Sequence, residues 1–239
     1  MFDVPKNNLN PLSKITVIGV GLIGGSFAKG LKKAGLAQTI FGFGHNESNL
    51  KKAVALGVVD EYSTDIETAV KDSDLIMLSV PLGVMKEVLA QIKPYLKKGA
   101  IITDAGSAKS SVISAVKSVF GMVPACFVPG HPIAGKEKSG VEAADPKLFI
   151  DHRVILTPTE STDSSAVKLV THLWQALGAN VESMSAQHHD NIFAATSHLP
   201  HLLAFSLVDM LNEHKELGNV FPYTAGGFRD FTRIASSDA

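Results

Sequence analysis

Residues 14–31 read KITVIGVGLIGGSFAKGL and combine a short β-branched run, a glycine-rich turn and an apolar periodic segment. Residues 14–20 are typical of a strand that is buried on both faces of a parallel sheet. The apolar spacing of residues 22–31 predicts a helix. Three glycines follow the order G-x-G-x-x-G: Gly19, Gly21 and Gly24. Strand, turn and helix together predict the first unit of an α/β domain.

Each glycine of this turn has a separate physical task. The first permits a tight turn, the second lets the backbone approach a pyrophosphate, and the third lets the helix pack closely on the strand. The helix N-terminus then faces the phosphate charge. The motif predicts dinucleotide binding through five residues: Gly19, Gly21, Leu22, Ile23 and Gly24. The alternative is a glycine turn in an α/β protein that binds no nucleotide.

The composition is that of an ordinary globular protein, with 239 residues, 45% hydrophobic and 19% charged. A net charge of −1 gives no reason to expect nucleic acid or an anionic membrane as a partner. The single cysteine, Cys126, excludes a disulfide within the chain. Residues 1–11 carry no signal-peptide pattern and no apolar run reaches membrane-spanning length, so we expect a cytoplasmic protein.

Strands and helices alternate along most of the chain. This order predicts a Rossmann-type, doubly wound α/β fold with a mostly parallel sheet, followed by an all-helical C-terminal domain. We expect a dinucleotide-binding domain over residues 1–184 and a helical domain over 185–239, which is about 55 residues and too small for a core of its own. Further strands are predicted at 38–43, 75–80, 100–103, 125–128, 154–157 and 179–183, and helices at 50–56, 85–92, 109–119, 166–177 and 193–211.

The end of the second predicted strand bears on the choice of cofactor. Enzymes that prefer NAD place an acid there to hold the ribose 2′-hydroxyl, and this strand ends in Gly-Phe-Gly-His-Asn without one. His45, Lys51 and Lys52 follow and offer positive charge or hydrogen bonds. The sequence therefore permits NAD or NADP and slightly favours NADP. The alternative is that both lysines belong to the solvated face of a helix.

Two polar stretches follow predicted strands, where open α/β sheets bind ligands. Asp104 and Ser107 lie in DAGSAK, and their alternative role is to cap the next helix. His131 lies in GHPIAGKE between a glycine and a proline, so it does not belong to a buried helix face. Its near-neutral pKa suits accepting a proton or hydrogen bond from a hydroxyl that loses hydride.

The helical segment holds two more candidate stretches. Pro200, in SHLPH, is expected to kink or interrupt the helix. Arg229 follows two glycines, and its guanidinium suits bidentate recognition of a carboxylate; a surface salt bridge is the alternative. The histidines of this segment have poor spacing for a metal, and no G-x-S-x-G motif of a hydrolase occurs.

These motifs, in this order, resemble the prephenate/arogenate dehydrogenase family of tyrosine biosynthesis. The resemblance covers almost the whole chain and rests on five stretches: GVGLIGGS at 19–26, DAGSAK at 104–109, GHPIAGKEKSG at 130–140, SHLPH at 197–201 and GGFRDFTRIASSD at 226–238. It implies a Rossmann domain followed by a helical dimerisation domain, and hence a homodimer. It also implies oxidative decarboxylation of prephenate to 4-hydroxyphenylpyruvate, or of arogenate to tyrosine, with NAD or NADP.

The resemblance further implies roles for individual residues. His131 matches the catalytic histidine, which accepts a hydrogen bond from the ring hydroxyl, and Ser107 matches the serine that orients this hydroxyl and the cofactor. Four residues match or border the substrate pocket: Arg229, His198, His201 and Glu137. His45 and Asp104 join the glycine turn as expected cofactor contacts.

The chain departs from the family pattern at two places. Lys136 stands where the family often has a small hydroxyl residue. The sequence stops at Ala239, where family members usually continue with further helices, so we expect the second domain to be incomplete.

Two other protein classes share the glycine turn. A β-hydroxyacid-type dehydrogenase would carry a catalytic lysine on the helix after the domain boundary, and residues 191–211 contain none. A non-catalytic nucleotide sensor would need the turn but not His131, Ser107 and Arg229 together.

Overall fold

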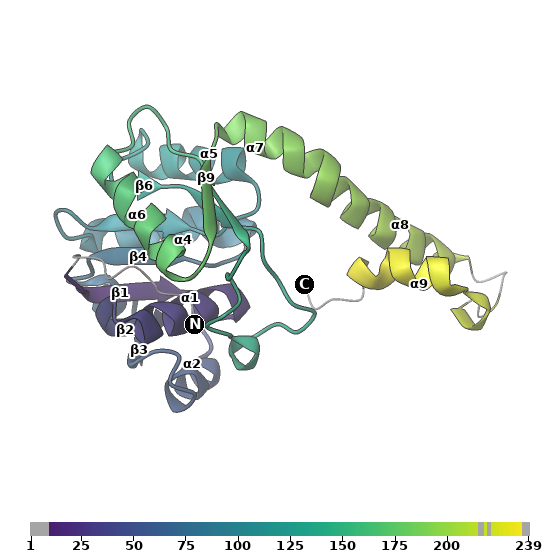
Figure 1. Ribbon diagram of the computed structural model, residues 1–239, viewed down its shortest axis with the longest axis horizontal. Coiled ribbons are helices and arrows are strands. Elements are labelled where there is room, and N and C mark those ends of the chain that lie inside the picture. The colour runs from purple at the N-terminus through teal and green to yellow at the C-terminus, as the bar shows by residue number, and fades with distance from the viewer. Residues whose placement is uncertain (1–9, 215–217, 219–220, 236–239) are drawn as a thin grey trace. The chain divides into compact units, whose positions relative to one another are not determined.

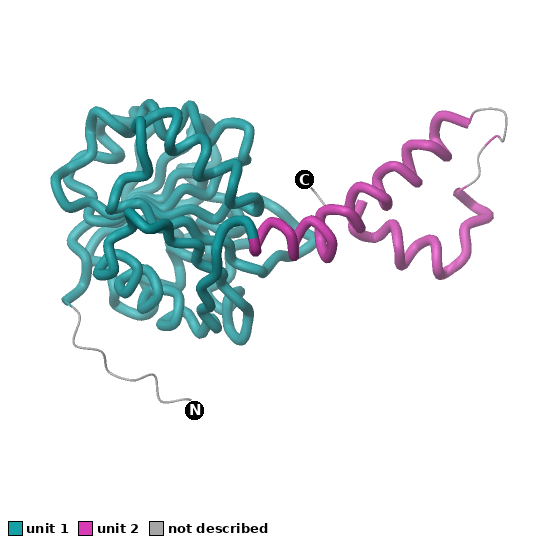
Figure 2. The backbone as a smooth tube through the Cα atoms, turned by 90° about the horizontal axis from the view of Figure 1, so that it is seen from above, with its two compact units in different colours: residues 1–187 teal, residues 188–239 magenta. Residues whose placement is uncertain are grey.

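The computed structural model describes residues 10–214, 218 and 221–235. The chain forms two compact units, residues 1–187 and residues 188–239 (Figure 2). The division at 187/188 lies close to the boundary expected at 184/185.

A six-stranded parallel sheet forms the centre of the first unit (Figure 1). Its strand order is β3-β2-β1-β4-β5-β6, so the direction of winding reverses between β1 and β4. This is the doubly wound order in which ligands bind beyond the carboxyl ends of the strands at the reversal point. The predicted Rossmann-type fold is confirmed. The strands are β1 Leu12–Ile18, β2 Ala37–Phe43, β3 Glu61–Ser63, β4 Leu75–Leu78, β5 Ile101–Asp104 and β6 Phe127–Val128.

The helices of this unit cover both faces of the sheet (Figure 1). They are α1 Leu22–Ala34, α2 Glu47–Ala55, α3 Ile66–Val70, α4 Met85–Ile92, α5 Lys109–Phe120 and α6 Ser164–Ala176, with single 3₁₀ turns at Leu82–Val84, Lys93–Tyr95 and Val141–Ala143. The sequence prediction missed β3 and α3. Both are too short to show a period in a window of about 11–18 residues.

The side chains of β4 show why the sheet carries a core on each face. Leu75 and Met77 belong to one buried cluster, with α1, α2 and α6, whereas Ile76 and Leu78 belong to the other, with α4 and α5. Successive side chains of a strand point to opposite faces, so a strand covered on both sides must be apolar throughout. The run LIML satisfies this requirement, and all four side chains are buried.

A second, three-stranded sheet holds the strands predicted at 154–157 and 179–183, which the sequence pattern assigns to a single parallel sheet, together with a short strand at 130–132 that the sequence does not predict. Its order is β7-β8-β9, with β7 Gly130–Pro132 antiparallel to β8 Arg153–Leu156 and β8 parallel to β9 Asn180–Ser183. The chain leaves β6 at Val128 and starts β7 two residues later. The intervening Pro129 has no N–H with which to extend the ladder, and its carbonyl accepts a hydrogen bond from Thr157 N instead.

One carboxylate fastens the amino edge of the large sheet. Asp74 accepts hydrogen bonds from Ser13 N at 2.6 Å, Lys14 N at 3.2 Å and Lys97 Nζ at 2.5 Å. Burial raises the pKa of Asp74, but the hydrogen bonds and the Lys97 charge outweigh it and hold the pKa below its ordinary value of 3.8. The ionised carboxylate therefore stabilises the start of β1 and β4.

We expect Asp74→Asn to lower the free energy of unfolding at pH 7 by about 1–3 kcal/mol, because two backbone amides and a lysine lose a charged acceptor. The folded-state pKa lies below the unfolded value, so this stabilisation is present above pH 3.8 and is lost as the pH falls through the folded-state pKa. Urea titrations from pH 7 to pH 3 measure it. The difference in the free energy of unfolding between wild type and variant should become smaller toward pH 3. A difference that stays constant with pH would contradict a stabilising role for the ionised Asp74 carboxylate.

The second unit is helical in its described residues. It contains most of α7 Ala186–Phe193, a π-helical segment Ala194–His198, α8 Leu199–Glu213, α9 Gly226–Thr232 and 3₁₀ turns at Phe221–Tyr223 and Arg233–Ala235. Pro200 occupies the first turn of α8, directly after the π segment. Since proline has no N–H to donate four residues back, the predicted interruption takes the form of a change in helix type rather than a break. Among the described residues, no helix is both long and apolar enough to span a membrane.

Candidate active site

The glycine turn after β1 can be built only by glycine at its first and third positions. Gly19 has φ +91°, and a Cβ there would lie 2.2 Å from the carbonyl oxygen of Ser79. A Cβ on Gly24 would lie 2.3 Å from the carbonyl oxygen of Gly19 and 2.9 Å from Val17. Both contacts are far inside van der Waals distance. The close approach of α1 to β1 and β4 thus depends on these two glycines.

The middle glycine leaves an open approach to the helix N-terminus. A Cβ on Gly21 would meet no atom within 4 Å, and Gly21 precedes α1 in an extended conformation with no side-chain cap. The first turn of α1 holds no acidic residue. The uncapped N–H groups and the positive end of the helix dipole therefore fit a pyrophosphate. The half-buried Leu22 and Ile23 belong to this first turn.

The end of β2 is tied back to the glycine turn. Asn46 caps α2 by accepting a hydrogen bond from Asn49 N at 3.0 Å, and the Asn49 side-chain amide donates to the carbonyl of Val20 at 3.1 Å. His45 is exposed, with its ring edge-on to Phe43 and the ring centroids 5.9 Å apart. His45 therefore borders the same end of the sheet as the glycine turn.

Both lysines beyond β2 are paired with carboxylates. Lys51 Nζ lies 3.1 Å from Glu47 Oε1, and this hydrogen bond raises the pKa of Lys51. Lys52 Nζ lies 2.7 Å from Glu142 Oε1, and the hydrogen bond and charge of Lys52 lower the pKa of Glu142. The positive charge that slightly favoured NADP is therefore locally neutralised.

The capping interpretation of Asp104 and Ser107 is wrong, because the residue before α5 is Ala108 and no side chain caps the helix. The Asp104 carboxylate is buried instead. It accepts hydrogen bonds from Gly106 N at 2.7 Å, Gly130 N at 3.1 Å and Lys109 Nζ at 2.5 Å. Because these donors leave no part of the Asp104 side chain exposed, it is not open to the cofactor contact that the resemblance implies.

The Asp104 carboxylate joins the two predicted catalytic segments. Gly106 directly precedes Ser107, and Gly130 directly precedes His131, so one side chain holds the backbone next to both residues. His131 lies on β7 opposite Ile155 of β8, and both Ser107 and His131 are half-buried. The two segments thus meet at the carboxyl end of β5.

Lys109 was missed as a functional candidate in the sequence. It is fully buried, pairs with Asp104 and also donates to the carbonyl of Gly130. The signal was a lysine five residues after an aspartate at a strand end. Nothing local distinguishes such a lysine from a solvated one at the start of a helix.

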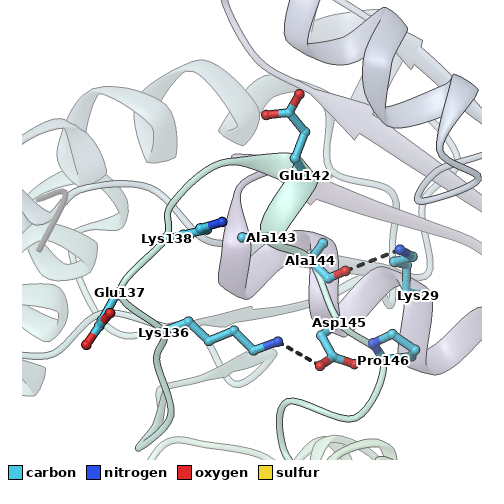
Figure 3. Close-up of a pocket in the computed structure, with 9 residues that line it drawn as sticks. All are labelled: Lys29, Lys136, Glu137, Lys138, Glu142, Ala143, Ala144, Asp145 and Pro146. Atoms are coloured by element: carbon cyan, nitrogen blue, oxygen red, sulfur yellow. Dashed lines mark hydrogen bonds and ion pairs between the residues drawn. The ribbon is translucent and has the colours of Figure 1, made fainter.

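The loop after His131 forms a separate pocket of about 710 Å³ with the α1 residue Lys29 (Figure 3). Glu137, the predicted substrate contact, lines it and is exposed. Lys136, which departs from the family pattern, forms an ion pair with Asp145 at 2.7 Å. This ion pair joins two parts of the same loop. Neither the glycine turn nor His131 lines the pocket.

The remaining predicted site residues lie in the second unit. His198 ends the π-helical segment, and His201 on α8 is 2.8 Å from the carbonyl of Ser197 through Nδ1. Arg229 is exposed on α9. No carboxylate among the described residues lies within ion-pair distance of it, so a salt bridge does not account for this arginine there. Within the same described ranges, no group of three His, Cys, Asp or Glu side chains has the arrangement of a metal site.

Each of the two units matches a known protein family profile. Residues 27–183 match the family profile described as "Prephenate dehydrogenase, nucleotide-binding domain", and residues 185–239 match "Prephenate dehydrogenase, dimerization domain".

Individual relatives agree with these profiles. The chain is 40% identical over 226 residues to cyclohexadienyl dehydrogenase of Zymomonas mobilis, covering 94% of this chain and 76% of that protein. It is 39% identical over 231 residues to prephenate dehydrogenase of Lactococcus lactis, covering 95% of this chain but 62% of that protein, which is less than two thirds.

A solved structure is similar in fold as well as sequence. It is the crystal structure of prephenate dehydrogenase from A. aeolicus in complex with hydroxyphenyl propionate and NAD⁺. The TM-score is 0.88 at 41% identity, and the match covers 97% of this chain and 80% of that one.

Proposed function

The chain belongs to the prephenate dehydrogenase family, and from this premise we propose that it oxidatively decarboxylates prephenate to 4-hydroxyphenylpyruvate with a nicotinamide dinucleotide. The observation that carries the proposal is the meeting of the Ser107 and His131 segments at Asp104. They meet at the carboxyl end of β5, on the same edge of the sheet as the uncapped N-terminus of α1. This shared edge supports a dinucleotide at the N-terminus of α1 with Ser107 and His131 beside the ring hydroxyl.

The reaction requires the protein to orient the substrate and the cofactor and to supply one base. The oxidised nicotinamide, when bound, supplies the hydride acceptor. In our proposal His131 accepts the proton of the ring hydroxyl as that carbon gives up its hydride and becomes a carbonyl. The ring carboxylate then leaves as carbon dioxide, the electron pair of the broken bond completes the aromatic ring, and His131 returns the proton to the phenolate oxygen. Ser107 orients the same hydroxyl. Aromatisation of the ring supplies the driving force, so a positioned base and a positioned substrate suffice.

We assign recognition of a substrate carboxylate to Arg229, with His198 and His201 as further substrate contacts. We expect Arg229→Gln to raise the KM for prephenate by about 10–150-fold, equivalent to the loss of a charge-assisted hydrogen bond of about 1.5–3 kcal/mol. Arg153→Gln is the matched control, because Arg153 makes an exposed ion pair with Glu182 at 3.3 Å. Steady-state kinetics on both variants measure the difference. An unchanged KM for Arg229→Gln would remove this residue from the site.

We propose that both NAD and NADP are accepted. Gly44 supplies no acid that would repel the 2′-phosphate of NADP. Lys51 and Lys52 are already paired with carboxylates, so they add no strong attraction for that phosphate. The slight preference for NADP then rests on His45.

The cofactor preference can be shifted by a single charge. A Cβ on Gly44 would contact only Leu50, at 3.8 Å, so a side chain fits there. We expect Gly44→Asp to move the ratio of kcat/KM values toward NAD by about tenfold through repulsion of the 2′-phosphate. Gly44→Asn is the uncharged control and should leave the ratio nearly unchanged. An equal shift in both variants would show that shape, not charge, decides.

We also propose that the second unit pairs with a second copy of the chain. Its helix α8 exposes several large apolar side chains: Leu199, Leu202, Leu203, Phe205 and Met210. The match of this unit to a dimerization domain supports the proposal. Light scattering that gives twice the chain mass of 25.3 kDa is the expected result, and a single chain mass contradicts it.

A four-way assay tests the proposed activity. Prephenate and arogenate are each paired with NAD and with NADP, and the reduced cofactor is followed by absorbance. Turnover of prephenate is the expected result, whereas turnover of arogenate alone would make the protein an arogenate dehydrogenase. A folded protein that binds the dinucleotide and turns over neither substrate would be a nucleotide-binding protein without this activity.

A further inference from the structure

Two charged side chains are buried together beneath the candidate active site. Among the described residues, Asp104 and Lys109 are the buried members of the Asp, Glu, Lys and Arg types, and both have 0% exposed side chains. A buried ion pair is weak evidence for stability, because well-packed apolar residues of similar volume are often as stable or more so. Such a pair therefore calls for an explanation other than stability.

The hydrogen bonds of the pair converge on the backbone at two places. Asp104 accepts from the N–H of Gly106 and from the N–H of Gly130. Lys109 donates to the carbonyl of Gly130. Both peptide groups of Gly130 are thus held, one by the carboxylate and one by the ammonium group, and the next residue along the chain is His131.

The surroundings leave no room for a side chain at either glycine, so the backbone at both positions lies close against its neighbours. A Cβ on Gly106 would lie 2.9 Å from Asp104 Oδ2 and 2.9 Å from Leu82, and one on Gly130 would lie 3.0 Å from the carbonyl oxygen of Asp104. Strand β7 has only three residues and belongs to the small sheet, whereas Asp104 ends β5 of the large sheet. The ion pair is therefore a joint between the two sheets.

We propose that Lys109 and Asp104 are positioning residues for the dehydrogenase reaction. Together they hold the backbone beside Ser107 and beside His131, so that both side chains meet the same substrate hydroxyl. This inference rests on the proposed function. Neither residue touches substrate, since both are fully buried and act through Gly106 and Gly130.

The test uses charge-removing variants of similar size together with a matched pair elsewhere. The ion pair between Asp104 and Lys109 is removed in three variants: Lys109→Met, Asp104→Asn and the double variant. The controls are Lys97→Met and Asp74→Asn, because Asp74 also accepts two backbone N–H groups and a lysine, at the amino edge of the same sheet. Each variant is assayed at saturating prephenate and cofactor, with the folded fraction measured by circular dichroism.

The expected result separates positioning from folding. We expect the double variant to remain folded, to bind NAD within about threefold of wild type, and to lose at least about tenfold in kcat, while the controls keep kcat. A double variant with full kcat would overturn the proposal. So would a loss of kcat that matches the loss of folded protein, or an equal loss in the controls.

A second measurement does not depend on turnover. The imidazole C–H resonance of His131, assigned by its absence in His131→Asn, reports the environment of the ring in the free protein. We expect this resonance to move in the double variant and to stay in place in Lys97→Met. If wild-type protein turns over neither substrate, the proposed function fails, and the resonance still decides whether the pair positions His131. An unmoved resonance overturns the positioning role.

Discussion

His131→Asn is expected to lower kcat by about 10²–10⁴-fold, which is the usual contribution of a positioned general base. Asparagine keeps a polar side chain of similar reach but has no group that takes up a proton near neutral pH. The backbone of β7 should be unchanged, because its register with β8 and the hold of Asp104 on Gly130 involve only main-chain atoms of this strand. The loss should therefore appear in kcat and not in folding.

The control for this variant is His152→Asn. His152 is exposed in the same unit, and its Nδ1 lies 2.9 Å from the carbonyl of Ile150. Turnover at saturating substrate, with dinucleotide affinity measured separately, distinguishes the two histidines. Equal activities would remove His131 from catalysis. Loss of dinucleotide binding together with turnover would instead point to a structural role.

Gly19→Ala is expected to destabilise the folded protein by about 2–5 kcal/mol, as the sum of a positive φ and a backbone clash. The added methyl would lie 2.2 Å from the carbonyl oxygen of Ser79, and neither backbone segment can move without disturbing β1 or β4. Urea unfolding measures the effect. A change below about 0.5 kcal/mol would show that the turn relaxes freely.

Gly21→Ala separates ligand binding from folding at the same turn. No atom lies within 4 Å of the added methyl, and the backbone there is extended with φ −105°, so stability should stay within about 0.5 kcal/mol of wild type. The methyl nonetheless occupies the approach to the helix N-terminus. Dinucleotide affinity should fall at least about tenfold by calorimetry. Unchanged affinity would mean that the phosphate lies elsewhere.

Local pattern was sufficient for most elements of the first unit. Residues 85–92 are the helix that the apolar spacing predicted, and residues 75–78 form the strand predicted over 75–80. Both segments carry their signal in their own residues, since an amphipathic period or an apolar run reports which sides must be buried. β7 carries no such signal, because three residues that include a glycine and a proline show no period.

Partners distant in sequence were beyond local reasoning. From the sequence, Lys52 is a candidate to bind a phosphate. In the structure its charge is neutralised by Glu142, which lies 90 residues away in the sequence. Asp104 has the residue type and position of a helix cap, but its carboxylate instead accepts a hydrogen bond from Gly130 N, 26 residues away. A residue's identity states what it can bond to, and only its neighbours in space decide which of those bonds form.

The sequence by itself determined the doubly wound fold and the glycine turn, because both follow from steric and hydrophobic rules that act within a few residues. It also determined the family, since five motifs occur in the family's order along the chain. The tertiary structure alone decided that the chain forms a second sheet and that Asp104 and Lys109 join it to the first. A buried charge is tolerated only when an opposite charge and hydrogen-bond partners lie beside it. Asp104 and Lys109 have these partners only because the fold packs the end of β5 against β7.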